Sequence, residues 1–94
     1  MRFILENELK KRGLRNNLTG TEYIREGVLY LLSRPAQPCP RMMDEVYPAI
    51  ARAAQTNRGN VEHCARYALR SAGCDGTVAG VIKDIAATCR AYED

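Results

Sequence analysis

One stretch of the chain, residues 56–73 (TNRGNVEHCARYALRSAG), divides into two faces when it is read at helical spacing. Its apolar residues recur at intervals of three and four, which is the pattern of a helix with one buried stripe. The opposite face carries groups that can hydrogen-bond to bases or hold phosphates, namely Arg58, Asn60, Glu62, His63, Arg66, Tyr67 and Arg70. The stretch therefore predicts an amphipathic helix over residues 58–72 with a polar front.

The residue types on this front match the groups that the major groove of DNA presents. Arg66 is predicted to fork onto O6 and N7 of a guanine, and Asn60 to pair with an adenine. Glu62 either accepts a hydrogen bond from a cytosine amine or braces Arg66 four residues later. Arg58 and Arg70, at the two ends of the helix, are placed for phosphates, which the helix N-terminus also favours.

For His63 and Tyr67, the remaining two residues of the front, the sequence allows more than one role. His63 is the single histidine, and Cys64 points about 100° away from it around the helix, so the two cannot hold one metal ion together. We therefore predict no metal site and no cofactor, and interpret His63 as a groove-facing or solvated side chain. Tyr67 either stacks on a sugar or thymine methyl group or covers the edge of the core.

Length and composition indicate which class of protein this is. Ninety-four residues form a single domain over residues 1–94, and 46% hydrophobic with 27% charged residues is typical of a globular chain. No Ser/His/Asp or Cys/His nucleophile set is present, so we predict that the protein is not an enzyme. No stretch reads as a secretory signal or a membrane span, which predicts a cytoplasmic protein without membrane contact.

Charge and cysteine content fit the same class. The formal net charge is +3, and 11 of the 14 basic residues are arginine, whose planar fork suits phosphates and base edges. A charge of this size permits nucleic-acid binding if it gathers on one face. The four cysteines have irregular spacing, which favours free thiols, although a secreted domain with two disulfides remains an alternative.

The apolar spacing divides the first half of the chain into two helices. The first is expected over residues 2–12, with Gly13 as its C-cap. The second is expected from Thr19 to about Ser33, opened by a capping box in which Thr19 and Glu22 satisfy each other's backbone amides. Arg34-Pro35 stops it, and the proline-rich connector PAQPCP follows.

The second half predicts a helix-turn-helix. A short helix is expected around residues 41–46, Tyr47 is expected outside the helical region because it precedes a proline, and Pro48 opens a helix over residues 48–54. After a three- or four-residue turn, Thr56 or Asn57 caps helix 58–72, and Gly73 ends it. Thr77 caps a last helix. No segment alternates with period two, so we predict an all-α fold, a compact bundle of five to six short helices.

Three segments of this chain resemble a family of sporulation regulators. TGTEYIREGVLYLL is similar to the family pattern Lys-Gly-x-x-Tyr-Leu-Arg-Glu-Ala at Gly20, Tyr23, Arg25 and Glu26. The family pattern Leu-Tyr-Pro-x-Ile-Ala is matched at Tyr47, Pro48, Ile50 and Ala51. The pattern Val-Glu-Arg-x-x-Arg-His is matched at Val61, Glu62 and Arg66. Over residues 14–73 the chain thus resembles the C-terminal effector domain of stage zero sporulation protein A.

The resemblance implies a sequence-specific DNA-binding domain that regulates transcription. It further implies binding to short paired boxes as a homodimer on double-stranded DNA, and contact with RNA polymerase. The family's proteins carry a phosphoacceptor receiver domain ahead of this one, whereas Met1 here lies almost directly before the effector domain. We therefore expect a free-standing effector, whose dimer interface lies on the terminal helices.

Departures from the family pattern fall on the predicted reading face. His63 stands where the family has arginine, Tyr67 where it has histidine, and Gly59 and Asn60 where it has serine and arginine. Each lost bidentate contact is worth about 1–3 kcal/mol, so a different or weaker site preference is expected. The alternative function is a small helical protein–protein interaction module that has lost specific DNA binding, or that antagonises a full-length relative.

Overall fold

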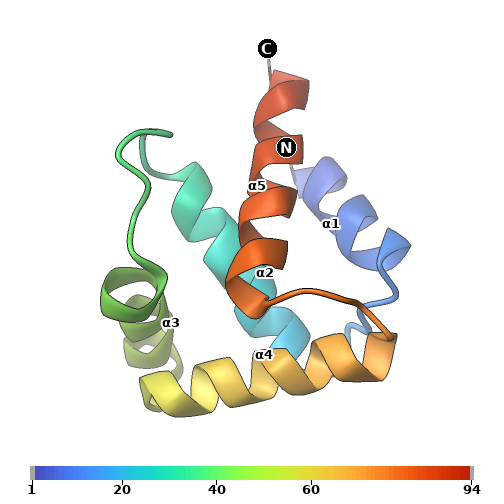
Figure 1. The fold of residues 1–94 in the computed structure, drawn as a ribbon, viewed down its shortest axis with the longest axis vertical. Coiled ribbons are helices and arrows are strands. Elements are labelled where there is room, and N and C mark those ends of the chain that lie inside the picture. Colours follow the sequence, from blue (N-terminus) through green and yellow to red (C-terminus); the bar gives the residue numbers. More distant parts are fainter. Residues whose placement is uncertain (1, 94) are drawn as a thin grey trace.

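The computed structural model describes residues 2–93, which form an all-helical bundle (Figure 1). Its elements are five α-helices and one π-helical turn: α1 (Arg2–Lys11), α2 (Thr19–Leu32), η1 (Met42–Val46), α3 (Tyr47–Ala54), α4 (Arg58–Ala72) and α5 (Val78–Glu93). No strand occurs among these residues. The all-α prediction and the predicted helix-turn-helix arrangement of the second half are both confirmed.

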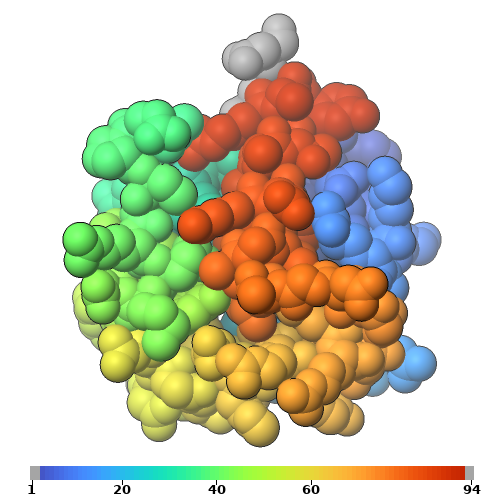
Figure 2. Space-filling view, in the orientation of Figure 1, coloured from blue at the N-terminus to red at the C-terminus, as the bar shows by residue number. Residues whose placement is uncertain are grey.

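Helix α2 occupies the centre of the bundle, with α4 lying across its start and α5 packed along its length (Figure 1). Its inward residues Ile24, Val28 and Leu31 repeat at intervals of three and four and are buried. Leu5 and Leu9 of α1 join the same core. Side chains from α1, α4, α5 and the connector close over this core on the face that Figure 2 shows.

Two glycines of α2 let its neighbours approach closely. A Cβ on Gly20 would lie 1.9 Å from the carbonyl oxygen of Cys64 and 2.9 Å from the Cβ of Ala68, both in α4. A Cβ on Gly27 would lie 2.9 Å from the Cδ1 of Ile82 in α5. Because the first contact is with backbone, it cannot be relieved by a rotamer change, so Gly20 sets the distance between α2 and α4.

The helix ends follow the predicted capping chemistry at four positions. Asn57 accepts a hydrogen bond from the Asn60 amide at 2.8 Å, and Thr77 accepts one from the Gly80 amide at 3.0 Å. Gly13 and Gly73 have φ angles of 81° and 70°, in the left-handed region that ends a helix. Of the two caps considered for α4, the structure therefore selects Asn57.

The predicted capping box at the start of α2 is wrong. The N-cap is Leu18, which offers no side-chain acceptor, and Thr19 is already the first helical residue. The Glu22 carboxylate instead accepts a hydrogen bond from Arg25. A guanidinium attracts a carboxylate more strongly than a neutral backbone amide does, and Arg25 is buried, so the ion pair prevails.

Arg25 also ties α2 to α1. Its guanidinium donates to both carboxylate oxygens of Glu6, at 2.7 and 2.9 Å, and to Asn16 at 2.9 Å. Hydrogen bonding to Glu6 raises the pKa of Arg25, while burial acts in the opposite direction and the bond to Glu22 adds to the increase. The buried charge is thus fully partnered.

The expectation that Tyr47 lies outside the helical region is also wrong. Its φ and ψ are −63° and −41°, and its amide donates to the Met42 carbonyl five residues back, so η1 continues directly into α3. The side chain of Tyr47 is only 2% exposed. We attribute the helical conformation to burial of this aromatic ring, which outweighs the steric preference of a residue before proline.

Substitution of Gly20 tests the close approach of α2 and α4. Gly20→Ala should lower the free energy of unfolding by at least about 2 kcal/mol, because the added methyl group overlaps the Cys64 carbonyl. Gly59→Ala is the matched control, since a Cβ there meets only the Asn57 side chain at 3.3 Å. Urea denaturation of both variants measures the difference. Equal stability of the two would contradict this account of Gly20.

Candidate nucleic-acid interface

Helices α3 and α4, joined by residues 55–57, form the helix-turn-helix. Gln55 adopts the left-handed conformation (φ 59°, ψ 45°), and the Thr56 amide returns to the Ala51 carbonyl at 2.9 Å. This turn sends the chain into α4, which runs along one end of the molecule (Figure 1). The inward stripe of α4 is buried against the bundle and consists of Val61, Ala65, Ala68 and Leu69.

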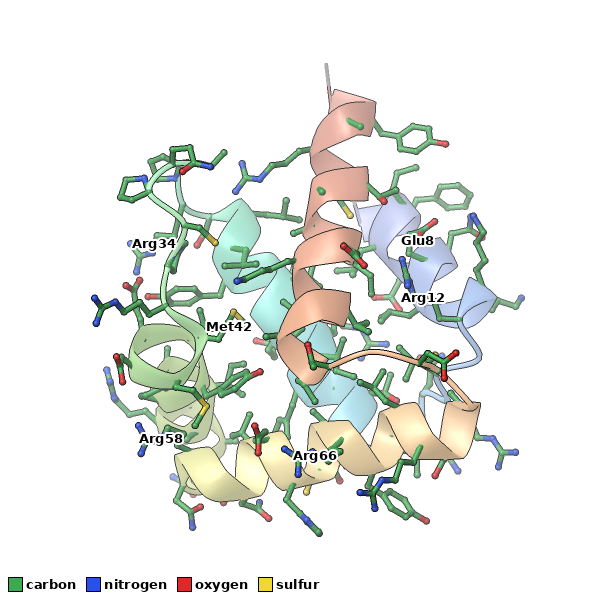
Figure 3. The ribbon with its side chains drawn as sticks, in the orientation of Figure 1. Glu8, Arg12, Arg34, Met42, Arg58 and Arg66 are labelled. Carbon is green, nitrogen blue, oxygen red and sulfur yellow. The ribbon has the colours of Figure 1, made fainter. Side chains whose placement is uncertain are left out.

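The outward side of α4 forms a continuous exposed ridge. Its members come from the predicted front, namely His63, Arg66, Tyr67 and Arg70. Tyr67 is 59% exposed, so the interpretation in which it covers the edge of the core is not supported. Figure 3 shows side chains of α4 at the lower edge of the molecule, on the side that faces away from the other helices, and labels Arg66 on the same helix. All four side chains are exposed in the structure of residues 2–93.

Arg66 is held in place by Glu62. Its guanidinium lies 2.7 Å from the Glu62 carboxylate, one helical turn earlier. The arginine side chain is 54% exposed, and a pair of this kind on a helix surface contributes about 0.3–0.5 kcal/mol. The pair therefore orients Arg66 but binds it only weakly. The guanidinium can leave the Glu62 carboxylate and bind a base edge instead. The bracing role predicted for Glu62 is therefore the one seen.

Two residues of the predicted front turn away from the ridge. Arg58 donates to the Met43 carbonyl at 3.2 Å and lies 3.9 Å from the Asp44 carboxylate, so it faces η1 (Figure 3). The side-chain amide of Asn60 donates to the Thr56 hydroxyl at 3.0 Å, so this side chain lies against the first turn of α4. Their predicted contacts with phosphate and adenine require these side chains to leave their present partners.

Tyr47 of α3 lies behind the Glu62–Arg66 pair. Burial raises the pKa of the Tyr47 phenol, the negative charge of Glu62 raises it further, and the Arg66 guanidinium opposes the shift. The phenol therefore stays neutral and packs as part of the core. It couples α3 to the side of α4 that carries the pair.

The pH dependence of stability tests this placement of Tyr47. Because its pKa is raised on folding, its contribution is complete below the unfolded value of about 10 and is lost as pH rises through the folded value. Above about pH 10, the unfolding free energy should fall more steeply with pH than in Tyr47→Phe, by at most about 1.4 kcal/mol per pH unit. Urea denaturation at several pH values measures these slopes. Equal slopes of unfolding free energy against pH in the wild type and in Tyr47→Phe would contradict the placement.

A cleft of about 510 Å³ opens beside the ridge, between α4, η1 and the start of α5. Arg66, Arg70 and Glu62 line it on the α4 side, and Met42 and Met43 on the η1 side. It lies on the face shown in Figure 2, where the chain around η1 meets α4 and the first turn of α5. Two of the exposed cations of α4 thus border a recess rather than a flat surface.

The loop between α1 and α2 flanks the other side of α4. A Cβ on Gly13 would lie 3.5 Å from the Ala72 carbonyl, and the Cys74 thiol lies 3.0 Å from the Arg12 carbonyl. Further along the loop, residues 17–20 share a pocket with His63, Cys64 and Tyr67. Arg15, between these two contacts, is exposed and forms no ion pair among the described residues. The loop that carries Arg15 therefore lies alongside α4, which helical periodicity alone could not show.

The described residues contain no metal-ligand cluster, no disulfide and no membrane-spanning helix. Within residues 2–93, no group of three or more His, Cys, Asp or Glu side chains is placed to hold a metal ion. In the same range, all four cysteines are free thiols. No helix there has the length and apolar character needed to cross a membrane.

Comparison with known families gives one match. Residues 5–91 match the family described as Sporulation initiation factor Spo0A C terminal, so the similarity includes most of α1 and most of α5. Neither the curated proteins nor the solved structures include a match to this chain.

Proposed function

Because the chain belongs to the Spo0A C-terminal family, whose members are DNA-binding regulatory domains rather than enzymes, we propose that it binds specific sequences of double-stranded DNA. In this proposal α4 enters the major groove, and its exposed ridge contacts the base edges. Regulation of transcription and contact with RNA polymerase belong to the same proposal, supported by family membership alone.

The observation that carries the proposal is the exposed and unobstructed ridge of α4. The 15 residues of α4 span roughly 22 Å, and the major groove, about 12 Å wide, admits one helix. The groups that project from it are an arginine oriented by Glu62, a second arginine, an imidazole and a phenol. These groups match donors, acceptors and methyl groups of base edges better than they match an apolar protein surface.

Roles within the ridge follow from position. Arg66, held at mid-helix by Glu62, is proposed to read guanine, and His63 and Tyr67 the neighbouring bases. Arg70, at the end of α4, and Arg15, in the flanking loop, are proposed to hold phosphates. Arg58 and Asn60 are proposed to contact DNA only after giving up their hydrogen bonds to Met43 and Thr56.

Selection followed by titration tests the proposal. Wild-type protein is used to select duplexes from a randomised library, and the preferred duplex is then titrated by fluorescence anisotropy at several salt concentrations. We expect Arg66→Ala to weaken binding to the preferred duplex about ten- to hundredfold and to relax one guanine position. The logarithm of affinity should fall linearly with the logarithm of salt concentration.

Lys83→Ala provides the matched control for charge. Lys83 is exposed on α5, away from the ridge, so its loss should change affinity by less than about threefold. If selection yields no preferred sequence, the proposal of specific binding fails. It also fails if the two variants weaken binding equally, because the role of Arg66 would then be only its charge.

We further propose that two copies bind DNA together through their terminal helices. Phe3 of α1 and Tyr92 of α5 are 77% and 69% exposed, and these two helices pack against each other. Large exposed aromatic side chains are typical of protein interfaces. Neither residue lies on α4, so pairing through them would leave the ridge free.

Sedimentation of the chain with a duplex carrying two copies of the selected site tests the pairing. Wild-type protein should load both sites cooperatively, and the double variant Phe3→Ala/Tyr92→Ala should load them independently, with single-site affinity unchanged. Cooperative loading by the double variant would contradict the assignment of the interface to the terminal helices.

A further inference from the structure

A second recess lies between α2 and α3, on a part of the surface that α4 does not line. It encloses about 590 Å³ and takes its walls from both helices. On the α2 side the apolar residues are Tyr23, Leu29 and Tyr30, and on the α3 side Ile50 and three alanines. No contact proposed above for DNA uses this groove.

The α3 side of the groove is built from small residues. Ala49 is half-buried, and Ala53 and Ala54 are exposed, so α3 presents methyl groups where longer side chains would fill the space. Helices pack with their axes 8–10 Å apart, and small residues at the contact allow the shorter distances. The alanines of α3 therefore leave room for another helix to pack closely along α2 and α3.

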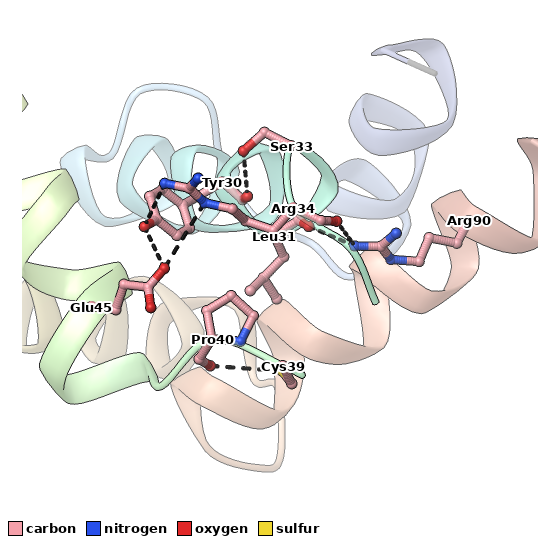
Figure 4. Close-up of polar contacts among 8 residues, drawn as sticks. All are labelled: Tyr30, Leu31, Ser33, Arg34, Cys39, Pro40, Glu45 and Arg90. Atoms are coloured by element: carbon pink, nitrogen blue, oxygen red, sulfur yellow. Dashed lines mark hydrogen bonds and ion pairs between the residues drawn. The ribbon is translucent and has the colours of Figure 1, made fainter. Parts of the chain in front are cut away.

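One end of the groove is fixed by a polar cluster (Figure 4). The Tyr30 hydroxyl donates to the Glu45 carboxylate at 2.6 Å and accepts from Arg34 at 3.0 Å. The Arg34 guanidinium also lies over the Tyr30 ring, 4.7 Å from its centroid. With its ring held from two sides, Tyr30 forms a preformed wall, which lowers the ordering cost of binding.

The charge of the groove is opposite to that of the chain. Its two charged lining residues, Glu22 and Glu26, are both acidic, although the net charge is +3. They lie one helical turn apart on the edge of α2. Glu22 forms an ion pair with Arg25, whereas Glu26 is exposed and forms no ion pair among residues 2–93. An occupant with a positive charge beside Glu26 would complement this edge.

From these features we propose that the groove binds an amphipathic helix of a partner protein, with an apolar stripe flanked on one side by lysine or arginine. The apolar stripe lies on the alanines of α3 and on Leu29, and a basic side chain of the partner lies beside Glu26. The proposal does not depend on DNA binding, because no residue of α4 contributes to the groove.

Selection from a displayed library of helical peptides tests the proposal. The peptides are about four turns long, with randomised charged and apolar positions, and are selected on the wild-type chain after depletion on Ala53→Arg. Ala53→Arg places a long cation in the groove from an exposed position, so it blocks a basic helix without disturbing the core. We expect enrichment of peptides with an apolar stripe bordered by lysine or arginine.

Anisotropy of an enriched, labelled peptide then locates the site. Glu26→Lys should weaken binding about five- to tenfold, and Ala53→Arg at least tenfold. The matched controls Asp84→Lys and Ala87→Arg, both at exposed positions of α5, should bind as the wild type does. Arg66→Ala should also retain peptide binding, so failure of this proposal and failure of the DNA proposal are distinguishable.

Several outcomes would overturn the proposal. One is the absence of enrichment, and another is enrichment of acidic or uncharged peptides. A third is equal peptide affinity of the groove variants and their α5 controls, with all variants folded by circular dichroism. A fourth is concentration-dependent dimerisation that Ala53→Arg abolishes, which would assign the groove to a second copy of the chain instead.

Discussion

The contact between Gly20 of α2 and the Cys64 backbone of α4 is the constraint on which the rest of the structure depends. With no Cβ at position 20, the start of α2 lies directly against the carbonyl of Cys64. This approach presses the buried stripe of α4 onto the central helix and leaves the opposite side of α4 facing outward. It also brings the loop before α2 alongside His63 and Tyr67. A single small residue thereby positions both the ridge and the segment that flanks it.

Much of this arrangement could be predicted from local chemistry. The periodicity of apolar residues located the helices, and the caps at Gly13, Asn57, Gly73 and Thr77 follow from residue type. The buried side of α4 also followed from spacing, because a helix of 15 residues has only one way to hide its apolar stripe. Local rules succeed where no distant partner competes.

The predictions that failed did so where such a partner exists. Glu22 was expected to cap α2 but pairs with Arg25, which α1 helps to bury. Tyr47 was expected outside the helix, but its ring lies in the core. A distant partner also sets the direction of Arg58, whose predicted phosphate contact stays a prediction, because its guanidinium donates to the carbonyl of Met43. None of these contacts can be predicted from the spacing of apolar residues along the chain.

The bundle exposes two surfaces of different character on different helices. The ridge of α4 carries arginines, an imidazole and a phenol, and the groove between α2 and α3 carries carboxylates and apolar side chains. Helix α3 borders both, because it precedes α4 in the helix-turn-helix and provides one wall of the groove. The DNA contact and the helix contact that we propose therefore use different surfaces and different chemistry.

A backbone-amide and side-chain NMR titration of the chain with its selected duplex tests the central claim most directly, because it shows which residues DNA contacts. The account predicts the largest shifts at His63, Arg66, Tyr67 and Arg70, smaller ones around Arg15, and none at Ala49 and Ala53 in the groove. Large shifts in α2, α3 or α5 with an unperturbed α4 would contradict it, because the exposed ridge would then not be the surface that meets DNA.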